Sequence, residues 1–351
     1  MKWGLLFLCI ALSAEEHIYL KTPKISREEV IGTSVGIRPY RKTGIRMEEE
    51  RYGDKVVIHN YGYGGSGITL SLAGAERAVE LVALHKEKTV AVLGAGVIGL
   101  ATAYELLKKG YEVHLYADAW NPNLTSNVAA GIWSPLKRPY DMSEERKMFH
   151  QKLAERAQMR FLENVGENPE FAGVRQIWSY SFKIGDQKEA ITTKHNGEAV
   201  IAHFDNGVTK KGKRIFEIGI EGNVFMDDLY AKVQRGGALL QEKRFSTLED
   251  VLQLTESVVV NCMSLGSREV FGDAEFLPCR GQMVYFPQQE GTDYLLYQNV
   301  PGATDMWISI YPWNDRILLG GILEWGEEEL CVNPAVIDRI IQNAEEGLYQ
   351  K

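Results

Sequence analysis

Apolar positions follow two periods along this chain, and together they predict strands that alternate with helices. Runs of consecutive apolar residues predict buried strands at 55–60, 89–93, 112–118 and 257–262. Apolar residues three and four positions apart predict helices at 68–85, 97–109, 143–164 and 226–234. Shorter strand patterns fill 171–216 and 278–331, and a closing helix is predicted at 333–346. Such alternation is typical of an α/β fold.

A glycine-rich turn joins the strand predicted at 89–93 to the helix that follows it. Gly94, Gly96 and Gly99 have the G-x-G-x-x-G spacing of dinucleotide-binding folds, in which a pyrophosphate lies at the helix N-terminus. Asp118 ends the next strand, about twenty residues further on, where a carboxylate accepts hydrogen bonds from the adenosine ribose. The strand and helix on either side favour nucleotide binding over a structural glycine turn.

A second glycine loop, at 61–67, connects the strand at 55–60 to the helix at 68–85. The free N–H groups and the dipole at such a helix end attract anionic or electron-rich groups. The α/β pattern occurs in separated blocks, which predicts a discontinuous Rossmann-type domain at 36–135 and 217–274. We expect an inserted β-rich substrate domain at 136–216 and 275–351, with 15–35 near the closing helix.

Composition and charge narrow the range of partners. The chain has 351 residues, 45% of them hydrophobic, which is enough for two packed domains or one large one. Its net charge of -8 leaves no basic surface for DNA or RNA. The seven histidines are scattered and the four cysteines lack metal-ligand spacing, so we expect neither a metal site nor a disulfide scaffold.

The N-terminus has the pattern of a secretory signal at 1–14. Lys2 precedes an apolar run at 3–12, and small residues follow it. The run is too short to span a bilayer, and no other stretch is membrane-like, so no stable membrane span is expected. A signal implies a secreted or periplasmic protein; the alternatives are an uncleaved anchor or a buried strand, with a cytoplasmic location if the segment is not a signal.

Seven segments together resemble the D-amino-acid oxidase family, the FAD enzymes related to glycine oxidase and D-aspartate oxidase. They are GIRPYR, VIHNYGYGGSGIT, GAGVIGLATAYEL, YADAWNPNLTSNVAAGIWSP, VVVNCMSLGSREVFGD, PCRGQMVYF and RILLGG. In the family, the segments similar to 36–41 and 57–69 lie near the C-terminus, after the strand similar to 316–321. Here they precede the strand at 89–93, which predicts a circular permutation with its break beside the closing helix after Asn333. Permutation is tolerated when the original termini lie close together at the surface.

The resemblance implies residues that bind the substrate. Arg38 matches the family's carboxylate-binding arginine, and its guanidinium fork suits a planar carboxylate. Arg41 is expected to be structural. The Gly65 carbonyl is implied to accept a hydrogen bond from the substrate amine.

The family's pocket tyrosine aligns with Ser309, so a direct match is missing. Strand alternation places Trp307, Ser309 and Tyr311 on one face, from which Tyr311 could supply the phenol. The alternative for Tyr311 is a structural aromatic residue, and Trp133 could equally be a core aromatic residue.

The resemblance also implies an FAD site. Residues 128–133 match the stretch whose backbone approaches the flavin's reactive nitrogen, and Thr125 and Ser126 match pyrophosphate ligands. Met263 and Ser264 replace a hydroxyl residue and a glycine of the family. The expected cofactor-binding residues are Gly64, Gly67, Ile68, Thr69, Gly94, Gly96, Val97, Ile98, Gly99, Asp118, Thr125, Ser126, Ala129, Ala130, Gly131, Ile132, Met263 and Ser264.

The resemblance implies oxidation of D-amino acids to 2-oxo acids, ammonia and hydrogen peroxide, with hydride transfer from Cα to flavin and oxygen as acceptor. Two alternatives stay open: a glycine or sarcosine-type amine oxidase, and a flavin-binding protein without oxidase turnover. The sequence leaves the preferred side chain and the oligomeric state open.

Overall fold

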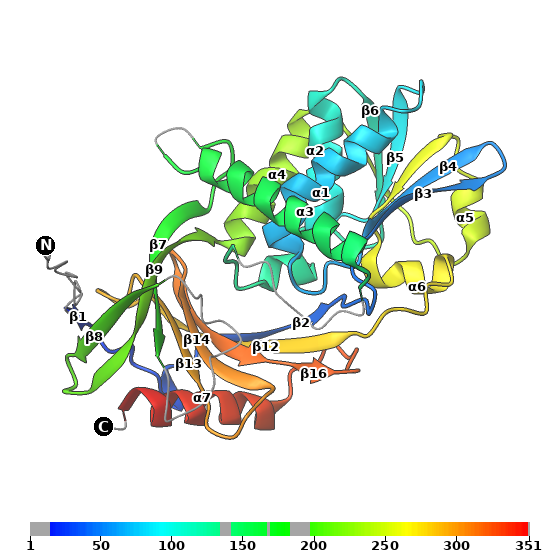
Figure 1. Cartoon of the computed structure of the whole chain (residues 1–351). Coiled ribbons are helices and arrows are strands. Elements are labelled where there is room, and N and C mark those ends of the chain that lie inside the picture. Colours follow the sequence, from blue (N-terminus) through cyan, green and yellow to red (C-terminus); the bar gives the residue numbers. More distant parts are fainter. Residues whose placement is uncertain (1–14, 134–141, 167–168, 183–196, 350–351) are drawn as a thin grey trace, which may run out of the picture.

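Two β-sheets, one mainly parallel and one mainly antiparallel, organise the part of the chain that the structure describes (Figure 1). This computed structural model describes residues 15–133, 142–166, 169–182 and 197–349. The secretory signal expected at 1–14 lies outside the described residues and stays a prediction. None of the described helices is long and apolar enough to cross a membrane.

The smaller sheet has the strand order β10-β6-β5-β11-β4-β3, and only β3 and β4 are antiparallel neighbours. The carboxyl ends of β4, β11, β5 and β6 therefore lie next to one another at one edge of the sheet. The strands are β3 (Arg46–Tyr52), β4 (Lys55–Tyr61), β5 (Thr89–Leu93), β6 (Glu112–Ala117), β10 (Leu239–Glu242) and β11 (Val258–Asn261).

Helices bury both faces of this sheet. Val56 and Ile58 of β4 pack toward α1, α2 and α4, whereas Val57 packs toward α5 and α6. This explains the continuous apolar runs, because a strand that is buried on both faces shows no polar alternation. The helices are α1 (Gly67–Val82), α2 (Val97–Lys108), α3 (Glu144–Glu163), α4 (Gly222–Arg235), α5 (Leu248–Leu252), α6 (Ser267–Val270) and α7 (Pro334–Tyr349).

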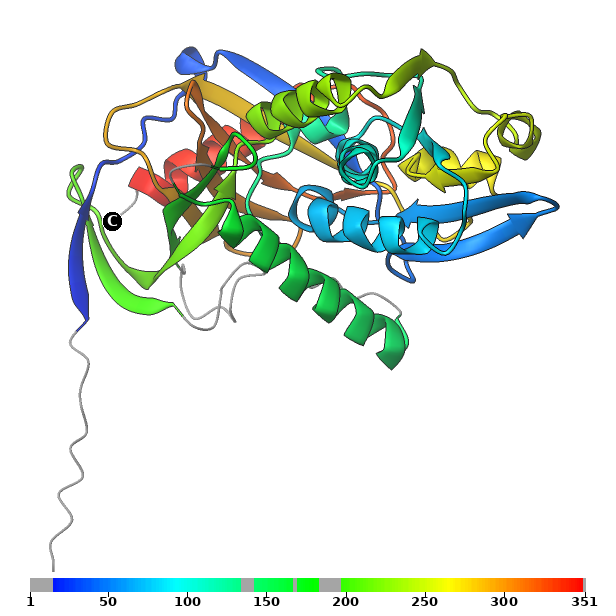
Figure 2. The same cartoon turned by 90° about the horizontal axis from the view of Figure 1, so that it is seen from above.

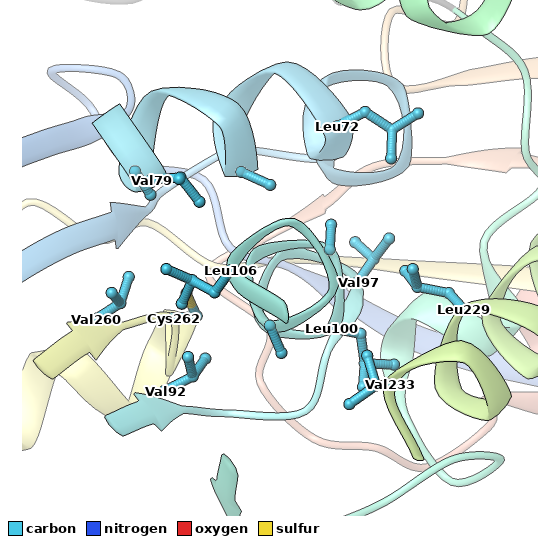
Figure 3. Packing of buried hydrophobic residues seen from close by; sticks show 14 of the residues in the cluster. Leu72, Val79, Val92, Val97, Leu100, Leu106, Leu229, Val233, Val260 and Cys262 are labelled. Carbon is cyan, nitrogen blue, oxygen red and sulfur yellow. The ribbon is translucent and has the colours of Figure 1, made fainter. Parts of the chain in front are cut away.

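The helix α2 lies at the centre of the half that is built on the smaller sheet. Its side chains Val97, Leu100 and Leu106 are buried between α1, α4 and the sheet (Figure 3). The helix α3 lies on the outside of α1, as Figure 2 shows from above. The α/β fold class predicted from the alternation of strands and helices is confirmed.

The larger sheet has ten strands in the order β1-β8-β9-β7-β13-β14-β15-β12-β16, and β2 also pairs with β12. Its helix α7 covers one face, where Ile337, Ile340 and Ile341 pack in one cluster with residues of β14 and β15. The other face turns toward the smaller sheet (Figure 1). The strands are β1 (Glu16–Leu20), β2 (Gly32–Arg38), β7 (Val174–Phe182), β8 (Glu198–Phe204), β9 (Thr209–Ile220), β12 (Cys279–Pro287), β13 (Leu295–Asn299), β14 (Met306–Pro312), β15 (Arg316–Ile322) and β16 (Glu324–Trp325).

The boundaries between the two halves differ from those expected at residues 36, 136 and 217. The strand β2 belongs to the larger sheet through its pairing with β12, although 36–38 is expected in the Rossmann-type domain. The strand β9 continues in the larger sheet to Ile220. The helix α3 packs on α1, although it is expected in the substrate domain. Strand pairing and helix packing set these boundaries, and local sequence patterns do not report them.

Two segments that bear on the expected permutation lie in contact. The hydroxyl of Tyr349, at the end of α7, accepts a hydrogen bond from Ile25 N at 2.8 Å and donates one to the Pro23 carbonyl at 3.0 Å. Residues 83–88 connect α1 directly to β5. Joining the end of α7 to 23–25 and opening 83–88 would place the segments at 36–41 and 57–69 after β15, as in the family, and would leave out only the edge strand β1. The permutation itself stays a prediction.

Candidate active site

Four loops meet at the carboxyl edge of the smaller sheet and line one large cavity. They follow β4, β5, β6 and β11, and residues of the larger sheet line the same cavity. Its volume is about 610 Å³. Ligands of open α/β sheets bind outside the carboxyl ends of the strands, so this cavity is the candidate site.

The three glycines of the first loop have different roles. A Cβ on Gly94, whose φ is 98°, would lie 2.7 Å from the Cys262 carbonyl oxygen. A Cβ on Gly99 would lie 1.8 Å from the Gly94 carbonyl oxygen, and Gly99 does not line the cavity. Gly96 does line it, and the nearest atom to a Cβ there would be Ser126 Oγ at 3.7 Å. Gly94 and Gly99 thus permit close packing, and Gly96 leaves the N-terminus of α2 open to a phosphate.

The residues expected to hold the nucleotide lie around this helix end. Ser126 Oγ accepts a hydrogen bond from Val97 N at 3.1 Å, and Thr125 and Ile98 line the cavity nearby. Asp118 follows β6, is exposed and lines the cavity, a position suited to ribose hydroxyl groups.

Lys243 and Phe245 also line the cavity, with Lys243 N bonded to the Ala117 carbonyl at 2.9 Å. Sequence reasoning missed both residues, because they follow a short edge strand that has no motif.

Residues 129–132 line the cavity, and three of them have backbone N–H groups without a partner among the described residues. The carbonyl oxygens of Ala130, Gly131 and Ile132 all accept hydrogen bonds from other elements, but their N–H groups have no partner among the described residues. A Cβ on Gly131, whose φ is 70°, would lie 1.6 Å from the Ile220 carbonyl oxygen. Free amide donors in a cavity wall suit the nitrogen and oxygen atoms of a flavin ring.

All but one of the residues expected from the second glycine loop line the cavity. Gly65, with φ of 96°, lines the cavity, as do Gly67, Ile68 and Thr69 at the start of α1. Gly64 is buried and does not line the cavity, so the cofactor contact expected of it is not supported. Its N–H group donates to the Pro39 carbonyl at 3.2 Å, which fixes the turn instead.

The family's glycine is replaced here by a strained serine. Met263 and Ser264 both line the cavity after β11, and Met263 N donates to Asn261 Oδ1 at 3.1 Å. Ser264 has φ of 56°, the one positive value among the described residues other than glycine. The backbone therefore takes the left-handed conformation at this position, at a cost in strain.

Arg38 and Arg41 have different environments. Arg38 is half-buried and lines the cavity, and its Nη1 donates to the Ile322 carbonyl at 3.2 Å. No described carboxylate pairs with its guanidinium group. Arg41 is buried and forms an ion pair with Asp273 at 2.8 Å, in keeping with the structural role expected of it.

Alternation along β14 separates two sets of side chains, as predicted. Trp307, Ser309 and Tyr311 line the cavity, whereas Ile308 and Ile310 pack in the core beneath α7. The indole of Trp307 lies against Gly321 of β15, where a Cβ would be 2.3 Å from Cε2.

Tyr297 is a cavity residue that sequence reasoning missed. It pairs with Ser309 across β13 and β14, and its ring is 5.9 Å from the Tyr311 ring, edge to face. Burial raises the pKa of Tyr297 well above its ordinary value and also raises that of Tyr311, so both phenols are neutral. The run LLYQN in β13 lacks alternation, so the sequence gives no signal for the face on which Tyr297 lies.

The donor set fits FAD. An open helix N-terminus, a carboxylate beside it and a row of unpaired amides line one cavity, which matches a pyrophosphate, a ribose and a flavin ring. No group of three or more potential metal ligands occurs among the residues that the structure describes.

Comparisons with known proteins agree with this geometry. Residues 89–211 match the family described as FAD dependent oxidoreductase (DAO). Human D-aspartate oxidase is 27% identical over 69% of this chain and 70% of its own length. A D-amino-acid oxidase of Dictyostelium discoideum is 25% identical over 70% of this chain and 68% of its own. The crystal structure of glycine oxidase from Geobacillus kaustophilus shares the fold, with a TM-score of 0.52, 14% identity and coverage of 73% and 76% of the two chains. Residues 89–211 are therefore a domain of the DAO family of FAD-dependent oxidoreductases, and FAD is its cofactor.

Proposed function

We propose that the protein is an FAD-dependent oxidase of D-amino acids, which converts each substrate, with oxygen and water, into a 2-oxo acid, ammonia and hydrogen peroxide. The position of Arg38 carries this proposal. Its guanidinium group lines the cavity and has no carboxylate partner among the described residues. An arginine fork binds a planar carboxylate through two parallel hydrogen bonds, so an α-carboxylate is the ligand that this end of the cavity supports best. The curated relatives that are D-amino-acid and D-aspartate oxidases support the same substrate class.

The residues at this end of the cavity would hold the substrate by its carboxylate and its amine. Bound FAD would supply the hydride acceptor and the route for electrons to oxygen. Arg38 fixes the carboxylate, and the Gly65 carbonyl, which belongs to the loop after β4, accepts a hydrogen bond from the amine. Fixing both groups accelerates the transfer because the reacting atoms are already aligned.

The cavity contains few groups that could act as a base, which also supports hydride transfer. The carboxyl groups among its described lining residues are Asp118, next to the nucleotide loops, and Glu328. Both oxygens of Glu328 accept hydrogen bonds from Arg268, at 2.6 and 2.7 Å. A substrate whose amine is neutral needs no further base.

A glycine or sarcosine-type oxidation is the second candidate. The Trp307 indole fills the space above Gly321 and lines the cavity, which reduces the room for a substrate side chain. A panel of D-alanine, D-aspartate, glycine and sarcosine separates the two, because a glycine oxidase would prefer the last two substrates.

The proposal is tested by Arg38→Ala with FAD bound. Loss of a buried charged hydrogen-bond partner costs about 2–5 kcal/mol, so kcat/KM for a D-amino acid should fall between about 30-fold and a few thousand-fold. Arg38→Lys should recover only part of the loss, because lysine lacks the planar fork. Arg77→Ala, which removes an exposed arginine of α1, is the control for charge and should leave kcat/KM unchanged. An Arg38→Ala variant with bound flavin and unchanged kcat/KM would contradict the proposal.

A further inference from the structure

The turn between β14 and β15 places one indole against residues 129–132, the segment with the unpaired N–H groups. Trp313 follows Pro312, the last residue of β14, and only 5% of its surface is exposed. Its Nε1 donates a hydrogen bond to the Ala130 carbonyl at 3.1 Å. Tyr311, which lines the cavity, stands two residues before Trp313. The contact therefore connects β14 to residues 129–132, where the unpaired N–H groups lie.

Fixing the Ala130 carbonyl also fixes the N–H group of Gly131. The two groups belong to one peptide unit, which is planar and trans, so they point in opposite directions. The Gly131 carbonyl accepts from Ile220 N at 2.9 Å, and the Ile132 carbonyl accepts from Thr69 Oγ1 at 3.1 Å. Three successive carbonyls are thus held from three elements, and the N–H groups of Gly131 and Ile132 are directed away from their anchors.

The turn that carries Trp313 is itself held in place. Trp313 N donates to the Arg316 carbonyl at 2.8 Å, which closes the hairpin. Asn314 N donates to Glu221 Oε1 at 3.2 Å, and the Arg175 guanidinium donates to the Pro312 carbonyl. The indole packs in one apolar cluster with Ile177, Leu295 and Leu318. These contacts keep the indole N–H aimed at Ala130.

We propose that Trp313 is a positioning residue for the flavin, which orients the Gly131 N–H group toward the ring through the Ala130 carbonyl. The inference rests on FAD binding and does not depend on which amine is oxidised. Of the three anchors, Ile220 belongs to β9 and Thr69 to α1, whereas Trp313 belongs to the hairpin that follows β14. Trp313 therefore couples the position of residues 129–132 to β14, the strand whose Trp307, Ser309 and Tyr311 line the cavity.

The test compares Trp313→Phe, which keeps a buried ring but removes the N–H donor, with the exposed Trp178→Phe as control. One hydrogen bond contributes about 0.5–1.5 kcal/mol, so the Kd for FAD should rise roughly 2- to 13-fold, and the visible bands of the bound flavin should shift. Titration of the apoprotein with FAD and absorption spectra measure both effects without a substrate. Trp178→Phe should change neither.

A purely structural role would lower the stability of the apoprotein and leave the flavin spectrum unchanged. That outcome for Trp313→Phe, with an unchanged Kd for FAD, would overturn the proposal. If the variant does not fold, benzothienylalanine at position 313 replaces the N–H group by sulfur in a ring of nearly the same shape. A wild-type spectrum and a wild-type Kd for FAD in that protein would overturn the proposal equally. Failure of every amine as a substrate would leave this result intact.

Discussion

The guanidinium group of Arg38 lies directly against the backbone of Gly281. A Cβ on Gly281 would be 2.3 Å from Nη1, 2.7 Å from Nη2 and 2.8 Å from Cζ. Gly281 belongs to β12, the neighbour of the strand that carries Arg38, and pairs with Gly36 there. The absence of a side chain at 281 therefore gives the guanidinium its place in the cavity.

Gly281→Ala should displace the Arg38 side chain without removing its charge. We expect KM for a D-amino acid to rise about tenfold or more, because the carboxylate loses its aligned fork. FAD affinity should stay the same. Steady-state kinetics on Gly281→Ala, Arg38→Ala and the double variant check this, since the alanine at 281 should have no further effect once Arg38 is absent. Additive losses in the double variant would show that Gly281 acts independently of Arg38.

Ser264→Gly should stabilise the protein. Ser264 holds φ at 56°, a conformation that glycine adopts without steric cost. We expect the free energy of unfolding of the apoprotein in urea to rise by about 1 kcal/mol. The gain is at the low end of the strain energy for such a conformation, because glycine also increases the conformational freedom of the unfolded chain. Ser264→Ala keeps the strained conformation and is the matched control. If alanine stabilised the protein as much as glycine, strain at 264 would not be the cause.

One buried and one half-buried histidine, His59 and His150, should make stability fall as pH falls from 7 to 5. Burial lowers the pKa of His59 and His150 to about 4, against about 6.5 in the unfolded chain. Between these values the unfolded chain binds more protons than the folded one, so acid favours unfolding by up to about 1.4 kcal/mol per pH unit for each histidine. Protonation of His150 Nε2 would also break its hydrogen bond from Ile45 N, now 3.1 Å long.

His150→Gln should therefore flatten the dependence of unfolding free energy on pH in this window. Urea unfolding at pH 7, 6 and 5 gives the slope of the unfolding free energy against pH. A loss of stability that is the same at every pH does not change this slope. A variant with the full wild-type slope would show that His150 does not contribute to it.

The expected permutation predicts that the chain can be reordered. A protein that starts at residue 87, runs to 351, continues through a short Gly-Ser linker to residue 21 and ends at 86 should fold and bind FAD. The contact of Tyr349 with Ile25 and Pro23 places the joined ends together. The chain 21–351 in its present order is the control. A reordered protein without native circular dichroism or bound FAD, beside a folded control, would count against the permutation.

Local signals explain why much of the nucleotide-binding half could be predicted. The strand β5 occupies the predicted residues, and α2 ends one residue before the predicted end. An apolar run, a glycine turn and a helical period stand in sequence there, and none needs a distant partner. The same holds for Gly96 and Asp118, whose positions follow from the spacing of the motif.

The remaining features depend on residues that are far apart in the sequence. Tyr297 reaches the cavity because β13 pairs with β14. Trp313 reaches Ala130 because its turn and residues 131–133 both bond to the end of β9 or to Glu221 beside it. Gly64 and Gly65 are neighbours in one loop, yet only Gly65 lines the cavity, because Gly64 N bonds to Pro39. Strand pairing decides these positions, and no local pattern encodes it.

Oxidase activity is tested by anaerobic mixing of the FAD-loaded protein with D-alanine, D-aspartate and glycine in turn, followed at the visible absorption maximum of the flavin. We expect a D-amino acid to bleach the flavin, and air then to restore the colour with release of hydrogen peroxide. A yellow colour that persists with every amine would contradict the proposed oxidase activity, and the protein would then be a flavin-binding scaffold without oxidase turnover.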